Sequence, residues 1–239
     1  MIINPFLILD FDDVLFPKKE VQKNITAQLT RLTGGQDLFT PFYLKTRREN
    51  NNFVDFKNVC AQFKQIYNLR FDPYLLFMTM DLTPYQKQIR ENRLFLARLK
   101  KQMIPFKIIT QGNREYQLLK LEKSGILAMI DPQTQLEIAT ENKIPLIVKE
   151  VKNNSNKNCL VVDNKLEILI TIKHLLEGKQ TVFTCKIGEW SGSEKENANE
   201  VKMIDFSLSK VSEVGKLLTD SPTGGKSIGK KLPAYKLVL

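Results

Sequence analysis

Histidine and cysteine are scarce in this chain of 239 residues, which contains one histidine and three cysteines. The single histidine, His174, argues against a catalytic triad or a zinc site that relies on histidine. The cysteines are odd in number and lack metal-ligand spacing, which favours reduced, buried thiols in a cytoplasm-like compartment over a disulfide framework. They are Cys60, Cys159 and Cys185.

Long apolar runs are also missing. The apolar N-terminal segment has no basic leader and is interrupted by Asn4 and Pro5, so we do not expect a signal peptide. No later run is long and apolar enough to cross a bilayer. We therefore expect a cytoplasmic protein with no membrane partner, long enough to bury a substantial core.

Acidic residues are fewer than basic ones: 26 Asp and Glu against 36 Lys and Arg, a net charge of +10. This excess favours an anionic partner, such as a small phosphorylated substrate, nucleic acid or an acidic surface. Much of it lies in lysine-rich stretches where a solvated face is the commoner explanation. Nucleic acid is the weaker alternative, because no motif interleaves aromatic and basic residues.

What the sequence does have, near its start, is an apolar run that ends in carboxylates. Phe6–Leu9 is followed by Asp10, Asp12 and Asp13, a pattern typical of a buried parallel strand that delivers acidic groups to its carboxyl end. Asp10 and Asp12 are two apart and point the same way on a strand, so they can share a cation such as Mg²⁺. Turn formation is the alternative explanation for these acids.

Further along, segments with helical spacing alternate with short apolar runs. The spacing predicts helices over 18–32, 37–48, 54–67, 72–80, 83–102, 116–124, 144–151, 165–176 and 209–218. It predicts strands over 6–9, 106–109, 126–130, 158–162, 180–185 and 203–206. Such alternation indicates an α/β fold with a doubly wound parallel sheet. The polar stretches 188–200 and 220–239 are predicted to be a surface loop and an extended or disordered tail.

Three of these predicted strands end in polar groups that suit one reaction: Asp10 and Asp12, then Thr110, then Asp163. A strand-end carboxylate can attack phosphorus, and a second one can protonate the leaving oxygen and activate water. A hydroxyl, backbone N–H groups and a lysine can hold the phosphoryl oxygens. The order of these residues predicts a phosphoryl-transfer site.

In these segments the sequence resembles the haloacid dehalogenase-like (HAD) hydrolase superfamily. Asp10–Leu15 looks like the first motif of that family, Asp-x-Asp-x-Thr/Val-Leu. Ile108–Asn113 looks like the second, an apolar strand that ends in Ser or Thr. Leu160–Asn164, with Glu167 after it, looks like the fourth. The third motif is only a lysine, for which we prefer Lys143 to Lys149.

The resemblance implies a role for each matched residue. Asp10 would be the nucleophile and a metal ligand, and Asp12 the general acid/base, with its backbone carbonyl also touching Mg²⁺. Thr110 and Lys143 would bind the transferring phosphoryl group, and Asp163 would hold the metal. The acid at Asp12 also favours a phosphatase, because the dehalogenase branch is not expected to have one there.

Substrate contacts are expected from the segment after Thr110, where N–H groups at the start of a helix favour anions. These residues are Gln111, Gly112, Asn113 and Arg114. The sequence departs from the family pattern at three positions. Asp13 stands where glycine is frequent, Asn164 where a second acid is common and Glu167 where aspartate is common, so one metal ligand is expected to be weaker or water-mediated.

The resemblance covers about residues 4–218 and implies a division of the chain. We expect an HAD-like core over 1–16 and 104–218, a helical cap over 17–103 and a basic tail over 219–239. Such a cap would exclude water and choose the substrate, or else form a helical subdomain with no part in selection. Its residues Lys45, Arg47 and Arg48 are candidates to meet an anionic group of the substrate, although a run of this kind is more often solvated.

The sequence thus predicts a cytoplasmic, Mg²⁺-dependent phosphatase that hydrolyses a small phosphomonoester through an aspartyl-phosphate. A phosphomutase on the same scaffold is a close variant, since the aspartyl-phosphate can pass to a hydroxyl instead of water. The alternative from another class is a catalytically weak HAD-fold protein that binds a partner, nucleic acid included.

Overall fold

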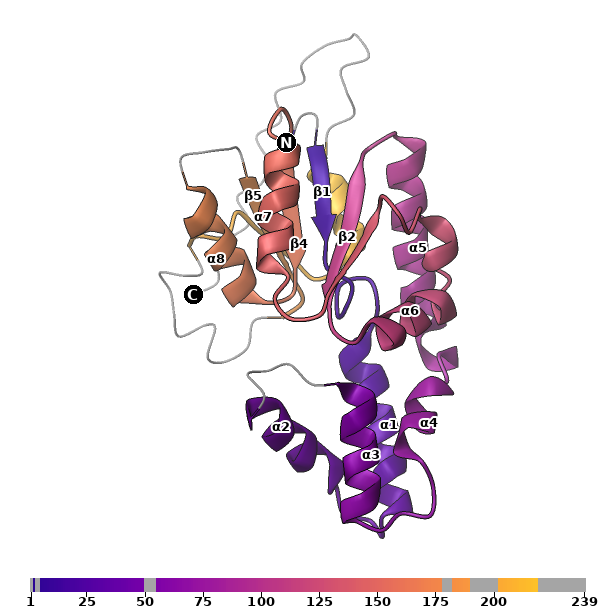
Figure 1. The fold of residues 1–239 in the computed structure, drawn as a ribbon. Helices are drawn as coiled ribbons and strands as arrows, with labels where there is room; N and C mark the ends of the chain where they lie inside the picture. The colour runs from indigo at the N-terminus through magenta and orange to yellow at the C-terminus, as the bar shows by residue number, and fades with distance from the viewer. Residues whose placement is uncertain (1, 3–4, 50–54, 178–181, 190–201, 219–239) are drawn as a thin grey trace.

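The computed structural model describes residues 2, 5–49, 55–177, 182–189 and 202–218 (Figure 1). In this part of the chain six parallel strands form one sheet, in the order β3-β2-β1-β4-β5-β6. The strands are β1 Pro5–Leu9, β2 Phe106–Gln111, β3 Leu136–Ala139, β4 Asn158–Asp163, β5 Val182–Ile187 and β6 Phe206–Leu208. The strand order reverses beside the central β1, which is where open α/β sheets bind their ligands.

Helices cover both faces of the sheet. On one face, α7 (Ile144–Asn153) and α8 (Leu166–Leu176) pack against the side chains that include Phe6 and Ile8 of β1. The alternate residues of β1, Leu7 and Leu9, pack in the other core cluster, with α5 (Gln86–Lys101), α6 (Arg114–Lys123) and the short helix η3 (Val211–Lys216). All five residues of β1 are buried, as a central parallel strand covered on both faces requires.

Four helices form an insertion beyond the carboxyl ends of the strands, in the lower part of Figure 1. They are α1 (Lys18–Leu32), α2 (Phe39–Glu49), α3 (Phe56–Ile66) and α4 (Pro73–Met78). Aromatic rings join them: Phe39 lies 5.1 Å from Phe63 and 5.7 Å from Phe77 between ring centroids. The insertion also meets the core, because Phe56 stacks on Tyr116 of α6 at 5.0 Å.

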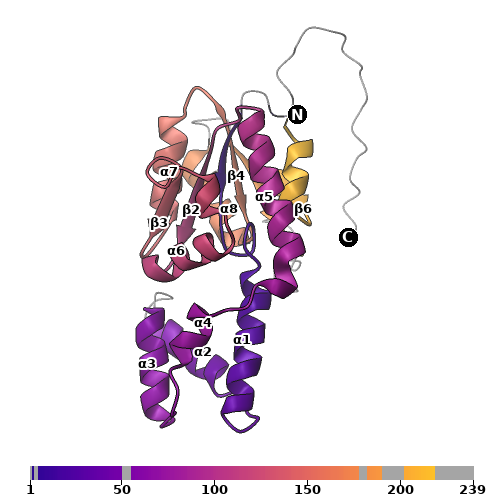
Figure 2. The same ribbon diagram turned by 90° about the vertical axis from the view of Figure 1, so that its right-hand side faces the viewer.

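Helix α5 lies beside the sheet and packs against η3 (Figure 2). The predicted cap, 17–103, therefore includes one helix, α5, that lies beside the sheet on the same side as η3. The four helices α1 to α4 stand apart from the sheet.

One predicted strand is wrong. Residues 126–130 contain a 3₁₀ helix, η2 (Leu127–Met129), in which the N–H of Met129 donates to the oxygen of Ile126 at 2.9 Å. Gly125, with a φ of +69°, ends α6 and turns the chain so that Ile126 is buried without pairing in the sheet. The third strand is instead β3, an edge strand of four residues, which is too short to give a strong pattern in the sequence.

Most of the other predicted elements are present with shifted ends. Most of predicted helix 83–102 is α5, which begins at Gln86 after a 3₁₀ turn, η1 (Thr83–Tyr85). The predicted helix over 209–218 is the 3₁₀ helix η3, and the predicted strand over 203–206 is β6, which begins at Phe206. The tail 219–239, and 190–200 of the predicted loop, lie outside the described residues. None of the helices in the described parts of the chain has both the length and the hydrophobicity needed to span a membrane.

Candidate active site

The carboxyl ends of β2, β1 and β4 bring the predicted site residues together. Asp10 directly follows β1, and its N–H donates to the oxygen of Val162 in β4 at 2.9 Å. Thr110 lies in β2 and Asp163 is the last residue of β4. Because these three strands are neighbours and parallel, their ends meet at one edge of the sheet.

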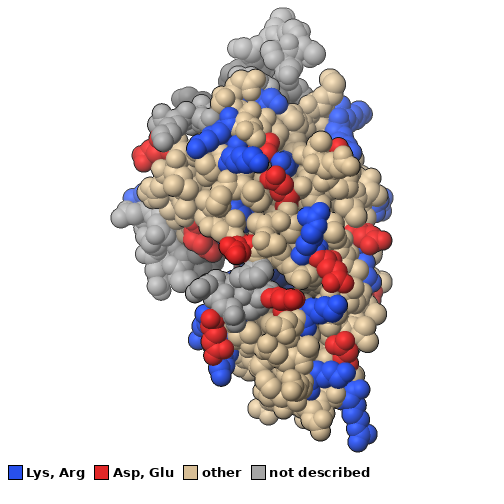
Figure 3. Space-filling view, viewed as in Figure 1, with Lys and Arg blue, Asp and Glu red and all other residues tan. Residues whose placement is uncertain are grey.

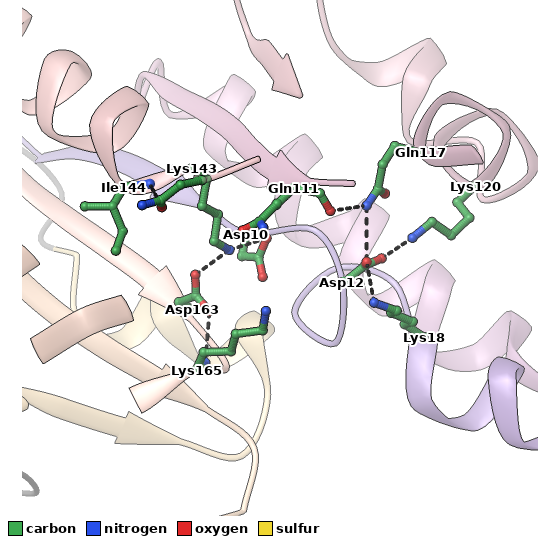
Figure 4. Close-up of polar contacts among 11 residues, drawn as sticks. Asp10, Asp12, Lys18, Gln111, Gln117, Lys120, Lys143, Ile144, Asp163 and Lys165 are labelled. Atoms are coloured by element: carbon green, nitrogen blue, oxygen red, sulfur yellow. Dashed lines mark hydrogen bonds and ion pairs between the residues drawn. The ribbon is translucent and has the colours of Figure 1, made fainter. Parts of the chain in front are cut away.

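A buried lysine links two of these carboxylates. The Nζ of Lys143 lies 2.7 Å from Oδ1 of Asp10 and 2.6 Å from Oδ2 of Asp163 (Figure 4). Lys143 stands at the N-cap of α7, and the side chain of Asn142 fixes this turn by accepting from the N–H of Ile144 at 2.9 Å. The alternative lysine, Lys149, is exposed on α7, so the structure brings Lys143 to the cluster.

Burial and neighbouring charges act against each other in this cluster, with a different outcome at each residue. Burial raises the pKa of Asp10 from 3.8 to about 6, against the lowering effect of Lys143 and with a further rise from Asp163. Burial also acts against the charge of Lys143, but Asp10 and Asp163 outweigh it and raise the pKa of that lysine above its ordinary value. Lys143 is thus a fixed cation between two carboxylates.

Asp12 belongs to a second group of contacts, separate from the first in Figure 4. Its carboxylate forms ion pairs with Lys120 and, at 3.2 Å, with Lys18. The amide of Gln117 donates to it at 3.2 Å and also donates to the backbone oxygen of Gln111 at 2.8 Å. Burial disfavours the charge of Asp12, but Lys120 and then Lys18 outweigh it and hold the pKa well below its usual range.

Lys120 is itself buried, with 1% of its surface exposed. Its Nζ lies 5.0 Å from the ring centroid of Tyr116, 5.5 Å from that of Phe11 and 5.6 Å from that of Phe16. Burial lowers the pKa of Lys120 to about 8, although Asp12 opposes this shift. The ammonium group of Lys120 therefore contacts three aromatic rings and one carboxylate.

Residues 110–114, at the end of β2 and the start of α6, divide into two groups. The hydroxyl of Thr110 is buried and has no hydrogen-bond partner among the described residues, and Thr110, Gln111 and Gly112 line a cleft with Asp10. Asn113 instead caps α6, accepting from the N–H of Tyr116 at 3.0 Å. Arg114 is exposed. Of the four predicted substrate contacts, the structure therefore brings Gln111 and Gly112 to the cleft, while Asn113 and Arg114 are not part of its lining.

The cleft has a volume of about 1170 Å³ and lies between the strand ends and the insertion. Asp10, Asp12, Thr110 and Lys143 line it on the core side, and Arg47 of α2 lines it from the insertion. Of the three basic candidates on α2, only Arg47 does so. Lys45 pairs with Glu49 at 3.9 Å instead, and Arg48 is exposed.

The donors at the strand ends fit a hard cation. Within the described part of the chain, no three side chains of His, Cys, Asp or Glu converge as a metal site. The atoms present are the carboxylates of Asp10 and Asp163, and the buried Oδ1 of Asn164, which has no hydrogen-bond partner among the described residues. Oxygen donors without sulfur or imidazole suit Mg²⁺ and not Zn²⁺.

Sequence reasoning missed five polar residues that complete this site. Gln117 and Lys120 stand on α6, and Lys18 begins α1. Lys165 lies two residues after β4, and Lys186 is the last residue but one of β5. On a helix, a lysine ordinarily indicates a solvated face. The available signal for one of them was positional, since Lys186 directly follows predicted strand 180–185, as Asp10 follows predicted strand 6–9.

No protein-family model matches the chain, and none of the curated proteins matches it. Solved structures do. A putative haloacid dehalogenase-like hydrolase from Burkholderia xenovorans LB400 has a TM-score of 0.66 at 15% identity, over 88% of this chain and 97% of that one. A dehalogenase with an intermediate complex has a TM-score of 0.59 at 16% identity, over 90% and 97% of the two chains. A putative HAD-hydrolase from Bacillus subtilis bound to magnesium has a TM-score of 0.50 at 14% identity, over 89% and 97%.

These likenesses, with the parallel sheet and its flanking helices, show that the chain has the fold of the HAD-like hydrolases. The predicted α/β fold with a doubly wound sheet is confirmed. At these identities the likeness establishes the fold and leaves the activity to the residues of the site.

Proposed function

We propose that this protein is a HAD-type hydrolase, a Mg²⁺-dependent phosphatase that acts on a small phosphomonoester in the cytoplasm. One observation carries the proposal: Asp10, the buried cation Lys143 and the unpartnered hydroxyl of Thr110 line the same cleft. A buried hydroxyl without a partner is costly unless a ligand satisfies it, and a phosphoryl oxygen is a strong acceptor. A nucleophilic carboxylate beside such a binding site suits phosphoryl transfer.

The reaction would proceed in two displacements. A carboxylate oxygen of Asp10 attacks phosphorus, the ester P–O bond breaks, and the alcohol leaves with a proton. Water then attacks the phosphorus of the aspartyl-phosphate and releases inorganic phosphate and free Asp10. Through both steps Thr110 donates a hydrogen bond to the phosphoryl group, and Lys143 offsets its charge. When bound, Mg²⁺ would be held by Asp10, Asp163 and the backbone oxygen of Asp12, and would supply further positive charge.

Asp12 would move the protons. Its ion pairs with Lys120 and Lys18 keep it as an anion, which suits it to accept a proton from the attacking water. To protonate the leaving alcohol first, Asp12 must itself gain a proton, and this requires the two ion pairs to loosen. Lys18 begins α1, so a movement of the insertion is the event that would loosen one of them.

The face shown in Figure 3 does not single out a surface for nucleic acid. On the face shown in Figure 3, Lys and Arg side chains are interspersed with Asp and Glu over the described residues. A stripe of one sign would be expected for a backbone-binding surface.

The test is phosphate release from a panel of phosphomonoesters, with Mg²⁺ and with a chelator, for the wild type and Asp10→Asn. We expect release that requires Mg²⁺ and is lost in Asp10→Asn, while Glu122→Gln, a change at an exposed carboxylate of α6, retains it. Transfer of the phosphoryl group to a hydroxyl of the substrate, without free phosphate, would indicate a mutase. No turnover of any kind by the folded protein would refute the proposed activity and favour a binding protein.

A further inference from the structure

Basic side chains from three separate elements face the cleft that contains Asp10 and Thr110. Lys165 follows β4, Lys186 lies in β5 next to Asp163 in the sheet register, and Arg47 comes from α2 of the insertion. Figure 4 shows the side chain of Lys165 reaching from the loop after β4 toward Asp10. Lys186 already donates to the backbone oxygen of Glu189 at 3.0 Å. Lys165 contacts Asp163 only through its backbone N–H, at 2.9 Å, so its ammonium group and the guanidinium of Arg47 lie outside the ion pairs of the proposed phosphoryl site.

The carboxylates deep in the site already have cationic partners. Asp10 and Asp163 pair with Lys143, while Asp12 pairs with Lys120 and Lys18. Positive charge that lies beyond these pairs is thus available to a ligand.

Lys165 and Arg47 have no ion pair in the described parts of the chain. Both are only partly exposed. Of the other carboxylates in the lining, Glu20, Glu167 and Glu189 are exposed, so that water and salt screen them. Asp13 accepts from the N–H of Lys19 at 2.8 Å, and Glu91 lies 3.4 Å from the ammonium group of Lys210, so these two carboxylates have partners of their own. Two partly buried cations facing a cleft without acidic partners are a recognition site for anions.

Resting on the phosphatase function proposed above, we infer that the substrate carries a second anionic group, a carboxylate or a second phosphate, which Arg47 and Lys165 bind. One phosphoryl group is accommodated by Thr110 and Lys143, and it leaves Arg47 and Lys165 unused. The planar guanidinium of Arg47 matches the paired oxygens of a carboxylate or phosphate, and it would approach the substrate from the insertion. A bound substrate would then contact both α2 and the carboxyl ends of the strands.

The first test compares turnover of matched substrates that differ only in the group on the third carbon: 3-phosphoglycerate, glycerol 3-phosphate and glycerol 1,3-bisphosphate. We expect the wild type to show at least about a tenfold higher kcat/KM for one or both of the doubly anionic esters, the effect of one charge-assisted contact. Arg47→Met and Lys165→Met should each reduce this preference to about threefold or less. Arg48→Met, on the next residue of α2 but exposed, should retain it.

Binding of phosphonates separates this inference from the proposed reaction, since a phosphonate has no ester bond to cleave. By calorimetry, phosphonopropionate or propane bisphosphonate should bind the wild type at least about tenfold more tightly than propylphosphonate, and Arg47→Met should remove the difference. Equal affinities for all three would overturn the second anion site even if phosphatase activity is found. Preference for the doubly anionic phosphonates without hydrolysis of any ester would support the anion site and refute the phosphatase.

Discussion

The Asp10 carboxylate should destabilise the folded protein when no metal is bound. Its side chain is 4% exposed, and burial, together with the neighbouring Asp163, raises its pKa from 3.8 to about 6. A folded-state pKa above the unfolded one means that the folded protein holds the proton more tightly. Stability from this group is therefore present at low pH and is lost as the pH rises from about 4 to about 6.

The size of the loss follows from the shift. A rise from 3.8 to about 6 corresponds to about 3 kcal/mol at neutral pH, since each pKa unit is worth about 1.4 kcal/mol. Asp10→Asn has a neutral side chain of the same shape and avoids this loss. In chelator at pH 7 we expect Asp10→Asn to unfold with a free energy up to about 3 kcal/mol greater than that of the wild type.

Urea unfolding at a series of pH values, with chelator present, measures this difference. It should be near zero at about pH 4 and grow until about pH 6, and added Mg²⁺ should shrink it by binding the wild type preferentially. Glu122→Gln, which changes an exposed carboxylate of α6, should track the wild type throughout. If Asp10→Asn were less stable than the wild type at pH 7 in chelator, the inference that the buried Asp10 carboxylate destabilises the fold would be refuted.

Three further variants probe other parts of the site. Lys120→Met should lower the free energy of unfolding by about 3 kcal/mol, because it leaves the buried carboxylate of Asp12 with Lys18 as its only ion-pair partner among the described residues. Urea titration measures this loss, with Lys123→Met, at an exposed lysine of the same helix, as the control. Thr110→Val should change stability by less than about 1 kcal/mol, since the hydroxyl has no partner among the described residues, yet reduce kcat/KM for phosphate release by about 10²-fold or more; unchanged kinetics would contradict its proposed role. Gly112→Ala should cost about 1–3 kcal/mol of stability, since Gly112 has a φ of +146° and an added Cβ would lie 3.0 Å from the Gln117 amide that contacts Asp12; a variant as stable as the wild type in urea would count against this.

Local sequence patterns were sufficient for the strands that form the centre of the site. Phe6–Leu9 and Leu160–Val162 are apolar and end in aspartates, and both are central strands of the sheet. A buried parallel strand must be apolar on both faces, so its pattern is visible in the chain itself. The edge strand Leu136–Ala139 has one neighbour and only four residues, with Glu137 among them, whereas 126–130 is a longer and unbroken apolar run. This difference explains why the sequence pattern favoured 126–130 as the strand.

The sequence alone determined which residue types stand at the strand ends: the order Asp10, Asp12, Thr110 and Asp163 is readable without coordinates. Only the tertiary structure decided the partners of those residues. Lys120 meets Asp12 because the fold brings α6 to the loop that follows β1, across 108 positions of sequence, and no local period records such a contact. In the same way, nothing in the run around Arg47 distinguishes it from its neighbours until α2 is placed over the strand ends, because exposure is a property of the packed molecule.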